Sequence, residues 1–235
     1  MFEPYFENLF YIKPGLKMLI PNERARDWYS PVEAAWVEEL KWTLDNVDLS
    51  KGRKVIDGGA HYGLYSICYA SMGCDCLAVD LHKNNCAMIE VNSAINNINL
   101  SYANCAIAHY DGTVKYNGEN LSTILSKGHV EVECRKISTL MPDANVVKLD
   151  IEGEEYNVLP EALETMKNVD TWIIEFHLWK FSDIDTAELL NRSLNLLVDN
   201  GYELSWIDRS DKNPKVVPYP DNALWRTQST VIARR

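Results

Sequence analysis

Short apolar runs alternate with helical hydrophobic patterns from about residue 54 to the end of the chain. Runs at 54–57, 76–80, 100–104, 146–150 and 171–176 have the length and composition of buried strands. Apolar residues at helical spacing lie between them, at about 62–72, between Ala87 and Ile98, after residue 150, and over about 182–200. Two further strands are expected at 202–207 and 229–233. This alternation predicts an α/β fold with a doubly wound, mostly parallel sheet.

Two stretches depart from that alternation. Asp111-Gly112 lies between the apolar segments 106–109 and 113–116, which predicts an inserted β-hairpin. Residues 130–135 alternate apolar and charged side chains, which predicts a half-exposed edge strand. Near the N-terminus, the segment Ser30-Pro31-Val32-Glu33 has the residues of a helix start, and an apolar stripe continues to Val47. We therefore expect residues 1–50 to be an arm and a cap helix packed on the same domain as residues 51–235.

Composition and charge narrow the class of protein. The chain has 235 residues, of which 46% are hydrophobic and 24% are charged, and this excludes disordered and disulfide-stapled classes. Its net charge of −11 disfavours binding of nucleic acid through a broad basic face. No apolar run approaches the roughly 18 residues of a membrane span, and the N-terminus does not resemble a signal peptide. The six cysteines include no Cys-x-x-Cys pair, so we expect reduced thiols in a cytoplasmic protein.

A glycine-rich turn follows the first buried strand, in the segment VIDGGAHYG at 55–63. A dinucleotide site of the form G-x-G-x-x-G beginning at Gly59 fails, because His61 and Leu64 occupy the other glycine positions. The spacing of Asp57, Gly59 and Gly63 instead suits S-adenosylmethionine, with Asp80 at the end of the second strand accepting the ribose hydroxyls. The alternative is an ordinary β–α turn followed by a surface aspartate. The expected cofactor-binding set is Asp57, Gly58, Gly59, Ala60, His61, Gly63, Asp80, Leu81, Asn104 and Asp150.

Several segments resemble one family, the FkbM-type methyltransferases. VIDGGAHYGLYS resembles the family's first motif, KLDIEGEEYNVLPEAL its K-x-D-x-E-G-x-E-x-x-x-L signature, and IIEFH its fifth-strand motif. The segments AVDLHKNNCAMIEVNSAINN, NCAIAHYDGTVKY and LVDNGYEL are also similar to the family, in the same order over about 32–207. The resemblance implies a seven-stranded, Rossmann-like class I sheet with a reversed last strand, S-adenosylmethionine as the methyl donor, and usually oxygen as the acceptor atom. Two positions depart from the family: Asp80 replaces the usual glutamate, and Pro160 predicts a helix break or a new helix start.

Polar residues follow the fourth and fifth strands, where the ligand crevice of such a sheet lies. The candidate catalytic residues are Lys148, Asp150, Glu152, Glu175 and His177. Asp150 is the first candidate for holding the methionine end of the cofactor or the acceptor. Glu175 and His177 share a strand face, so either is a candidate base, and His177 has the more suitable ordinary pKa. Glu152 has two interpretations, a catalytic one and a helix-start carboxylate, and Glu155 is interpreted as a solvated helix residue.

Two features leave alternatives open. Asp150, Glu175 and His177 suit magnesium or manganese, but a histidine beside a carboxylate is more often a hydrogen-bonded pair, so no metal is favoured. Residues 208–227 form a long polar segment between the last two strands, interpreted either as a substrate lid or as a surface excursion. The residues that such a lid would use are Lys212, Lys215, Tyr219, Trp225 and Arg226.

The sequence thus predicts an S-adenosylmethionine-dependent methyltransferase that acts on a hydroxyl of a small molecule or sugar. A nicotinamide-dependent oxidoreductase on a similar sheet is the main enzymatic alternative. A protein that binds S-adenosylmethionine without turnover is the alternative from another class. A nucleic-acid acceptor is disfavoured by the charge, no membrane partner is expected, and the oligomeric state is left open.

Overall fold

The computed structural model describes residues 5–8, 13–21, 35–117, 128–177, 186–208, 216–218 and 229–235. An eight-stranded sheet forms its centre, in the order β12-β11-β13-β10-β9-β3-β4-β5. These strands are β3 (Lys54–Gly58), β4 (Asp75–Asp80), β5 (Ser101–Asn104), β9 (Val146–Leu149), β10 (Thr171–Glu175), β11 (Glu203–Asp208), β12 (Val216–Pro218) and β13 (Ser229–Arg234). The pairs from β5 across to β10 are parallel, whereas β13 runs antiparallel to both β10 and β11.

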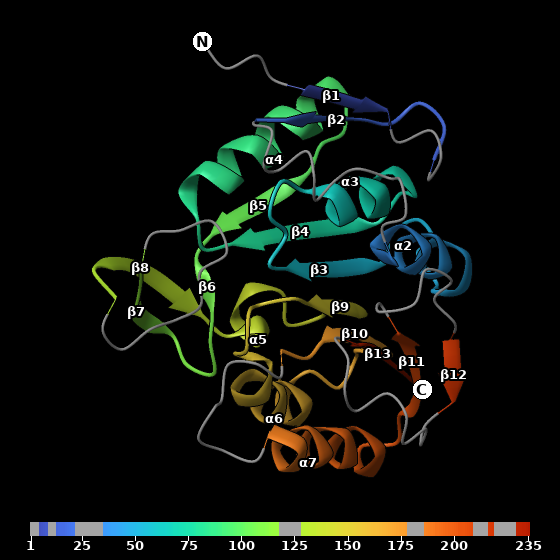
Figure 1. The fold of residues 1–235 in the computed structure, drawn as a ribbon, viewed down its shortest axis with the longest axis vertical. Coiled ribbons are helices and arrows are strands. Elements are labelled where there is room, and N and C mark those ends of the chain that lie inside the picture. Colours follow the sequence, from blue (N-terminus) through green and yellow to red (C-terminus); the bar gives the residue numbers. More distant parts are fainter. Residues whose placement is uncertain are drawn as a thin grey trace.

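The predicted sheet with a reversed last strand is confirmed, and it gains one short strand. Seven strands of the described chain correspond to the predicted ones, and the reversed strand β13 inserts between β10 and β11 (Figure 1). The eighth strand, β12, extends the sheet by pairing with β11 from within the segment considered as a lid. The candidate lid residues themselves lie outside the described residues.

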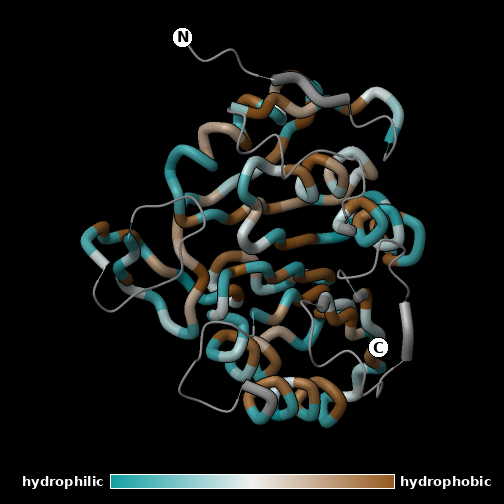
Figure 2. Tube along the Cα trace, viewed as in Figure 1, coloured by the Kyte–Doolittle hydropathy of each residue, from teal (hydrophilic) through white to brown (hydrophobic). Residues whose placement is uncertain are grey.

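Helices cover both faces of the sheet because alternate strand residues point to opposite sides. Val55, Val146 and Ile173 belong to one buried cluster, while their neighbours Ile56, Val147 and Trp172 belong to another. The first cluster packs with α2 (Ala35–Asn46), α3 (Leu64–Ser71) and α4 (Lys83–Ile95), the second with α5 (Ile137–Leu140), α6 (Glu155–Thr165) and α7 (Thr186–Asp199). Hydrophobic positions gather along the strands and on one side of α7, whose leucines Leu190, Leu194 and Leu197 are buried (Figure 2).

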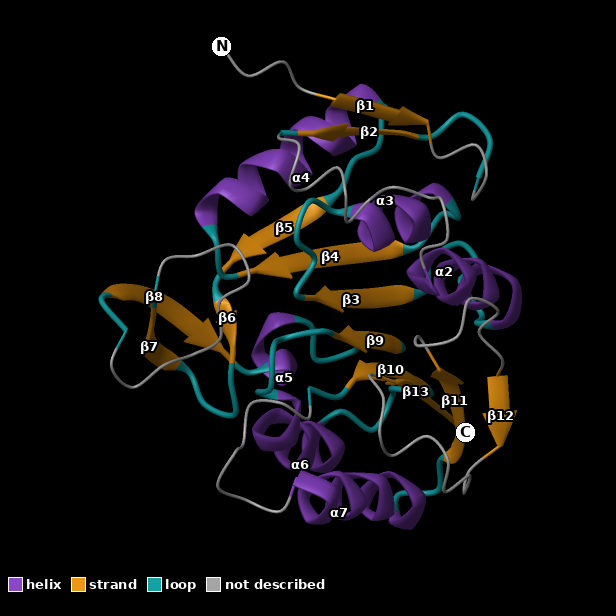
Figure 3. Cartoon of the chain, in the orientation of Figure 1, coloured by secondary structure: helices purple, strands orange, loops and turns teal. Residues whose placement is uncertain are grey.

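A second, three-stranded sheet projects at the edge where the parallel strands of the main sheet end (Figure 3). It contains β6 (Ala106–Ile107), β7 (Gly112–Tyr116) and β8 (Val130–Arg135), in the order β6-β8-β7. The predicted insertion is present, but the prediction that segments 106–109 and 113–116 pair across Asp111-Gly112 is wrong. Both segments bond to β8 instead. The prediction that residues 130–135 form an edge strand is therefore also wrong, because β8 has a paired strand on each side and is the central strand of this sheet.

The prediction that Pro160 breaks the helix or starts a new one is also wrong. The described chain is helical from Glu155 to Thr165, with Pro160 inside. Proline removes one N–H and normally costs about 3 kcal/mol in a helix interior. The neighbouring apolar positions Val158, Leu159 and Ala162 are fully buried, so packing of this face maintains the helix through the proline.

The N-terminal part packs against the same core as the glycine-rich turn. A two-stranded antiparallel pair, β1 (Tyr5–Asn8) and β2 (Lys17–Ile20), lies beside α4 (Figure 1). Asn92 of α4 and Asn96, its C-cap residue, each bond both the N–H and the C=O of a β2 residue, Leu19 and Lys17 respectively. These amides act as a neighbouring strand would, which explains the asparagine-rich end of α4. The predicted helix start at 30–33 lies outside the described residues.

Two further observations concern the cysteines and the apolar character of the helices. All six cysteines are free, as expected for reduced thiols, and all are buried. No helix in the described ranges combines the length and apolar character that a membrane span requires.

Candidate active site

The glycine-rich turn after β3 crosses very close to the chain after β9. Gly59 has a φ of +78°, and a Cβ built on it would lie 1.8 Å from the backbone oxygen of Asp150. The N–H groups of Gly59 and Ala60 donate to the carbonyl of Val79 at 2.9 and 3.0 Å, and this fixes the turn to β4. Gly63, with a φ of +86°, is the N-cap residue of α3. Only glycine permits both the left-handed backbone and the close approach at residue 59.

Asp80 joins this turn to the end of β4. One carboxylate oxygen accepts from the N–H of His61 at 2.9 Å, and the other accepts from the N–H of His82 and the side chain of Asn85 at 2.8 and 3.0 Å. Burial raises the Asp80 pKa to about 7, although these donors oppose that shift. Asn104, at the end of β5, donates to the carbonyls of Asp80 and Leu81. These bonds hold the Asp80 carboxylate beside the glycine-rich turn. The predicted contact of Asp80 with the ribose stays a prediction.

His61 is a side chain of the turn whose pKa is shifted by burial. It has a φ of +50° and stacks on Tyr62 with ring centroids 3.8 Å apart. Burial lowers its pKa to about 4, so the imidazole is neutral near pH 7.

Asp57 lies beneath the turn and is 1% exposed. Its Oδ2 accepts from the Ser66 hydroxyl of α3 at 2.5 Å, and its Oδ1 lies 3.8 Å from the Lys148 ammonium. Burial raises the Asp57 pKa, and the Lys148 charge opposes that shift. Asp57 therefore connects α3, β3 and β9, whatever contact it makes with a cofactor.

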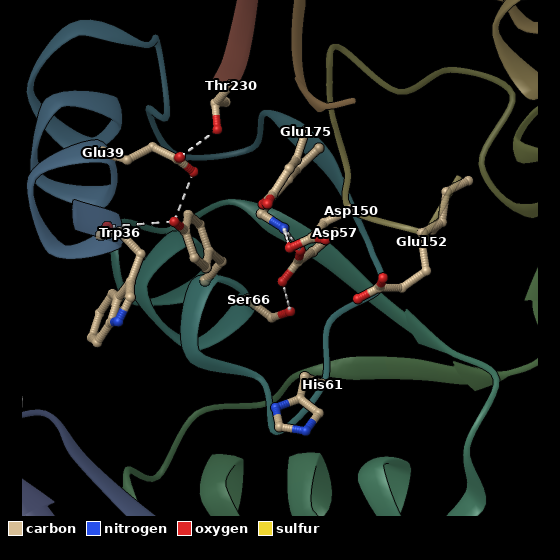
Figure 4. A network of polar contacts seen from close by, with 12 residues as sticks. Trp36, Glu39, Asp57, His61, Ser66, Asp150, Glu152, Glu175 and Thr230 are labelled. Atoms are coloured by element: carbon tan, nitrogen blue, oxygen red, sulfur yellow. Dashed lines mark hydrogen bonds and ion pairs between the residues drawn. The ribbon is translucent and has the colours of Figure 1, made fainter. Parts of the chain in front are cut away.

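The ends of β9 and β10 bring together all the candidate catalytic residues. We call Lys148, Asp150, Glu152, Glu175 and His177 the edge cluster. Asp150, Glu152 and Glu175 are labelled in Figure 4. The Lys148 ammonium lies 3.3 Å from Asp150 Oδ2 and 4.6 Å from the centre of the Tyr65 ring. Burial alone would lower the Lys148 pKa, but the Asp150 carboxylate and its acidic neighbours outweigh burial and raise it. Lys148 is therefore a fixed positive charge at neutral pH.

His177 is the centre of the edge cluster. Its Nε2 lies 3.6 Å from Glu152 Oε2, 3.7 Å from Asp150 Oδ1 and 3.9 Å from Glu175 Oε1. Its Nδ1 lies 3.0 Å from Glu155 Oε1. Burial would lower the His177 pKa, but the Glu155 bond and the surrounding carboxylates raise it to about 9. The sequence-based preference for His177 as the base rested on its ordinary pKa, and this environment changes that pKa.

The interpretation of Glu155 as a solvated residue is wrong. Glu155 is 0% exposed, and its Oε1 accepts from both the Ile151 N–H and His177. It shares the buried stripe of α6 with Val158, Leu159 and Ala162, at i+3, i+4 and i+7. That helical spacing is the sequence signal that would have identified it.

Glu152 does not begin the helix. It has a φ of +57° in the turn between β9 and α6, and its carboxylate turns toward His177. Since α6 begins at Glu155, the geometry favours the interpretation of Glu152 as a site residue over that of a helix-start carboxylate.

Glu39 of α2 is a polar residue that the sequence pattern did not reveal. Its carboxylate is 1% exposed and accepts from the Tyr65 hydroxyl at 2.8 Å and from Thr230 at 2.6 Å (Figure 4). Tyr65 in turn presents its ring to Lys148. Glu39 therefore links α2 to Tyr65, whose ring contacts the Lys148 ammonium of the edge cluster.

A family model described as a methyltransferase FkbM domain matches residues 57–204, which include the turn and the whole edge cluster. No curated protein is similar enough to this sequence to count as a match.

Solved methyltransferase structures share the fold. The SAM-dependent methyltransferase from Agrobacterium tumefaciens is 13% identical, with a TM-score of 0.56 over 100% of this chain and 71% of that one. The tRNA (uracil-54, C5)-methyltransferase of Pyrococcus abyssi, solved with S-adenosyl-L-homocysteine, is 15% identical, with a TM-score of 0.54 over 99% of this chain and 44% of that one. TYW2 of M. jannaschii, solved with AdoMet, is 15% identical, with a TM-score of 0.53 over 100% of this chain and 86% of that one.

Proposed function

The chain belongs to the FkbM methyltransferase domain family, and from that premise we propose that it transfers a methyl group from S-adenosylmethionine to a hydroxyl of a small molecule or sugar. The observation that carries this proposal is the contact between Gly59 and Asp150. That contact joins a glycine-rich turn suited to a cofactor to a cluster of acids and bases suited to proton transfer.

The chemistry of the turn fits S-adenosylmethionine. When bound, this cofactor supplies an electrophilic methyl group on a positively charged sulfur. Asp57, Asp80 and Asp150 are carboxylates at or beside the turn, and they suit the cationic and hydroxyl groups of such a molecule. Asp80 holds the backbone of His61 in the turn and of His82 after β4, so it also fixes the shape of the surface that a cofactor meets.

The edge cluster supplies groups that take up the acceptor proton. The side chains of Asp150 and Glu152 are 28% and 21% exposed, whereas Glu175 and His177 are almost completely buried. An acceptor therefore reaches the first pair directly. We assign proton removal to this carboxylate pair, with the charge of Lys148 orienting Asp150.

The acceptor is proposed to be small and uncharged. Neighbours in fold include a tRNA methyltransferase, so fold alone selects no acceptor. The net charge of −11 and the acidic edge cluster both repel a phosphate backbone. A neutral polyol or sugar has no such penalty.

The test uses S-adenosylmethionine with a labelled methyl group and a panel of monosaccharides, polyols and phenols, with bulk tRNA as the polyanionic arm. We expect label on an oxygen of a small acceptor and none on tRNA. General bases contribute about 10²–10⁴-fold, so Glu152→Gln should lower kcat by roughly that factor if Glu152 takes the proton. Glu131→Gln, an exposed acid on β8, is the matched control. Label on tRNA alone, or on a carbon or nitrogen, would contradict the proposal.

A further inference from the structure

Three side chains of the edge cluster have the spacing of ligands around one ion. A carboxylate oxygen from Asp150, a carboxylate oxygen from Glu175 and a ring nitrogen of His177 all lie within 4.8 Å of one another. Ligands held about 2.0–2.6 Å from an ion are separated by about 3 to 5 Å, depending on whether they are adjacent or opposite. The distances from His177 Nε2 to Asp150 and Glu175, 3.7 and 3.9 Å, fall in that range and exceed a direct hydrogen bond.

The orientation of His177 is an independent observation that points the same way. Histidines that bind metals commonly donate their other ring N–H to a carboxylate, which fixes the ring and its tautomer. Glu155 occupies that position, because its Oε1 contacts Nδ1 at 3.0 Å while the Ile151 N–H holds the same oxygen at 2.9 Å. When an ion displaces the Nε2 proton and the remaining proton is on Nδ1, the lone pair of Nε2 faces the carboxylates of Asp150, Glu152 and Glu175.

The charge of the site also favours a cation. The carboxylates around His177 and Lys148 are Asp57, Asp150, Glu152, Glu155 and Glu175. Among the described residues they outnumber the basic Lys148 and His177, and Asp57, Glu155 and Glu175 are buried. Gathering like charges in a low-dielectric interior is costly unless a cation balances them. Asp150 and Glu152 keep partly exposed side chains, which leaves the ion a route in from solvent.

We propose that Asp150, Glu175 and His177 bind a divalent cation, with Mn²⁺ preferred to Mg²⁺ because the ligand set combines carboxylates with an imidazole. Glu155 is then a positioning residue that orients His177. The role of the ion rests on the proposed function: bound beside Asp150, it would hold the acceptor hydroxyl and lower the pKa of that hydroxyl. With Asp150 bound to the ion, proton removal, which the proposed function assigns to Asp150 and Glu152 together, would fall to Glu152, which is outside the ligand set.

The test measures metal binding directly, without turnover. The full chain is freed of metals with EDTA, desalted and titrated with Mn²⁺, and free Mn²⁺ is followed by electron paramagnetic resonance. We expect one ion per chain for the wild type. Glu155→Gln should weaken binding about 10–100-fold, the usual effect of removing a group that orients a ligand. Asp150→Asn should weaken it at least as much, and Glu131→Gln should leave it unchanged.

Folding is checked for each variant by circular dichroism, and Glu175→Asp replaces Asp150→Asn if the latter does not fold. Absence of Mn²⁺ binding by the wild type, or full affinity in the ligand variants, would overturn the metal site. Metal binding without methyl transfer to any acceptor would uphold the site and remove the proposed function. Methyl transfer that survives EDTA in a chain that binds no Mn²⁺ would uphold the proposed function and overturn the metal site.

Discussion

The close approach of Gly59 to Asp150 predicts an unusually large effect of one methyl group. In Gly59→Ala, the new Cβ would lie 1.8 Å from the Asp150 backbone oxygen, whereas real Cβ atoms essentially never come within 3.0 Å. The turn and the chain after β9 must therefore separate by about 1.2 Å (3.0 − 1.8). That movement strains the bond from the Asp150 N–H to the Gly58 carbonyl, which is 3.0 Å long.

Gly201→Ala is the matched control, because it has the same backbone strain without the contact. Gly201 has a φ of +85°, close to the +78° of Gly59, and a Cβ there would meet nothing within 4 Å. A left-handed alanine costs about 1–2 kcal/mol, and this cost is common to both variants. We expect Gly201→Ala to lower the free energy of unfolding by about 1 kcal/mol. For Gly59→Ala we expect a loss of about 3 kcal/mol or more, as for other overpacked sites with strained backbone.

The assay is urea unfolding followed by tryptophan fluorescence, with binding of S-adenosylhomocysteine measured on the folded variants. Gly59→Ala should lose both stability and ligand affinity, while Gly201→Ala should keep its affinity. If the two variants lose equal stability, the turn does not cross the chain at Asp150 as closely as the structure indicates.

The remaining predictions concern buried charges. The His177 pKa is raised from 6.5 to about 9, and by linkage this difference adds about 3 kcal/mol (2.5 × about 1.36) to the free energy of unfolding. This stabilisation is fully present below about pH 6.5 and is lost as the pH rises through about 9. In EDTA, His177→Gln should therefore differ from the wild type in unfolding free energy more at about pH 6 than at about pH 10, and an equal difference would contradict the assignment. The groups that face His177 and produce this shift are Glu155, Asp150, Glu152 and Glu175. Glu155→Gln should lower the His177 pKa, measured by NMR of the imidazole, and an unchanged pKa would count against the Glu155 contact. Glu39→Gln should lower the free energy of unfolding in urea by about 1–2 kcal/mol, because it removes the charge from two buried hydrogen bonds. The control Glu38→Gln, at the exposed neighbouring residue, should lower it by under about 0.5 kcal/mol. Equal losses would refute the burial of Glu39.

The sequence predicts the elements that depend on local pattern. Strand β3, the glycine-rich turn and α3 follow one another as the spacing of Asp57, Gly59 and Gly63 indicates. The shared faces of Lys148 with Asp150, and of Glu175 with His177, follow from the two-residue repeat of a strand. These residues meet because the carboxyl ends of neighbouring parallel strands lie at one edge.

The sequence does not predict the features that depend on distant partners. Asp111-Gly112 favours a local hairpin, but the pairing energy of β8, which is more than ten residues away along the chain, decides the outcome. Glu155 and Glu39 are charged, and charged residues are usually exposed to solvent, so residue type alone predicts that both are exposed. Each nevertheless lies on the apolar stripe of its helix, and each finds its partners, His177 and Thr230, only in the folded chain.

Binding of S-adenosylhomocysteine tests the central claim most directly, that the turn after β3 and the edge cluster form a methyl-transfer site. The measurement is calorimetric titration of the wild-type chain with S-adenosylhomocysteine and, separately, with NAD. We predict saturable binding of S-adenosylhomocysteine at one site per chain and no binding of NAD. Binding of NAD without S-adenosylhomocysteine, or of neither ligand, would contradict the account.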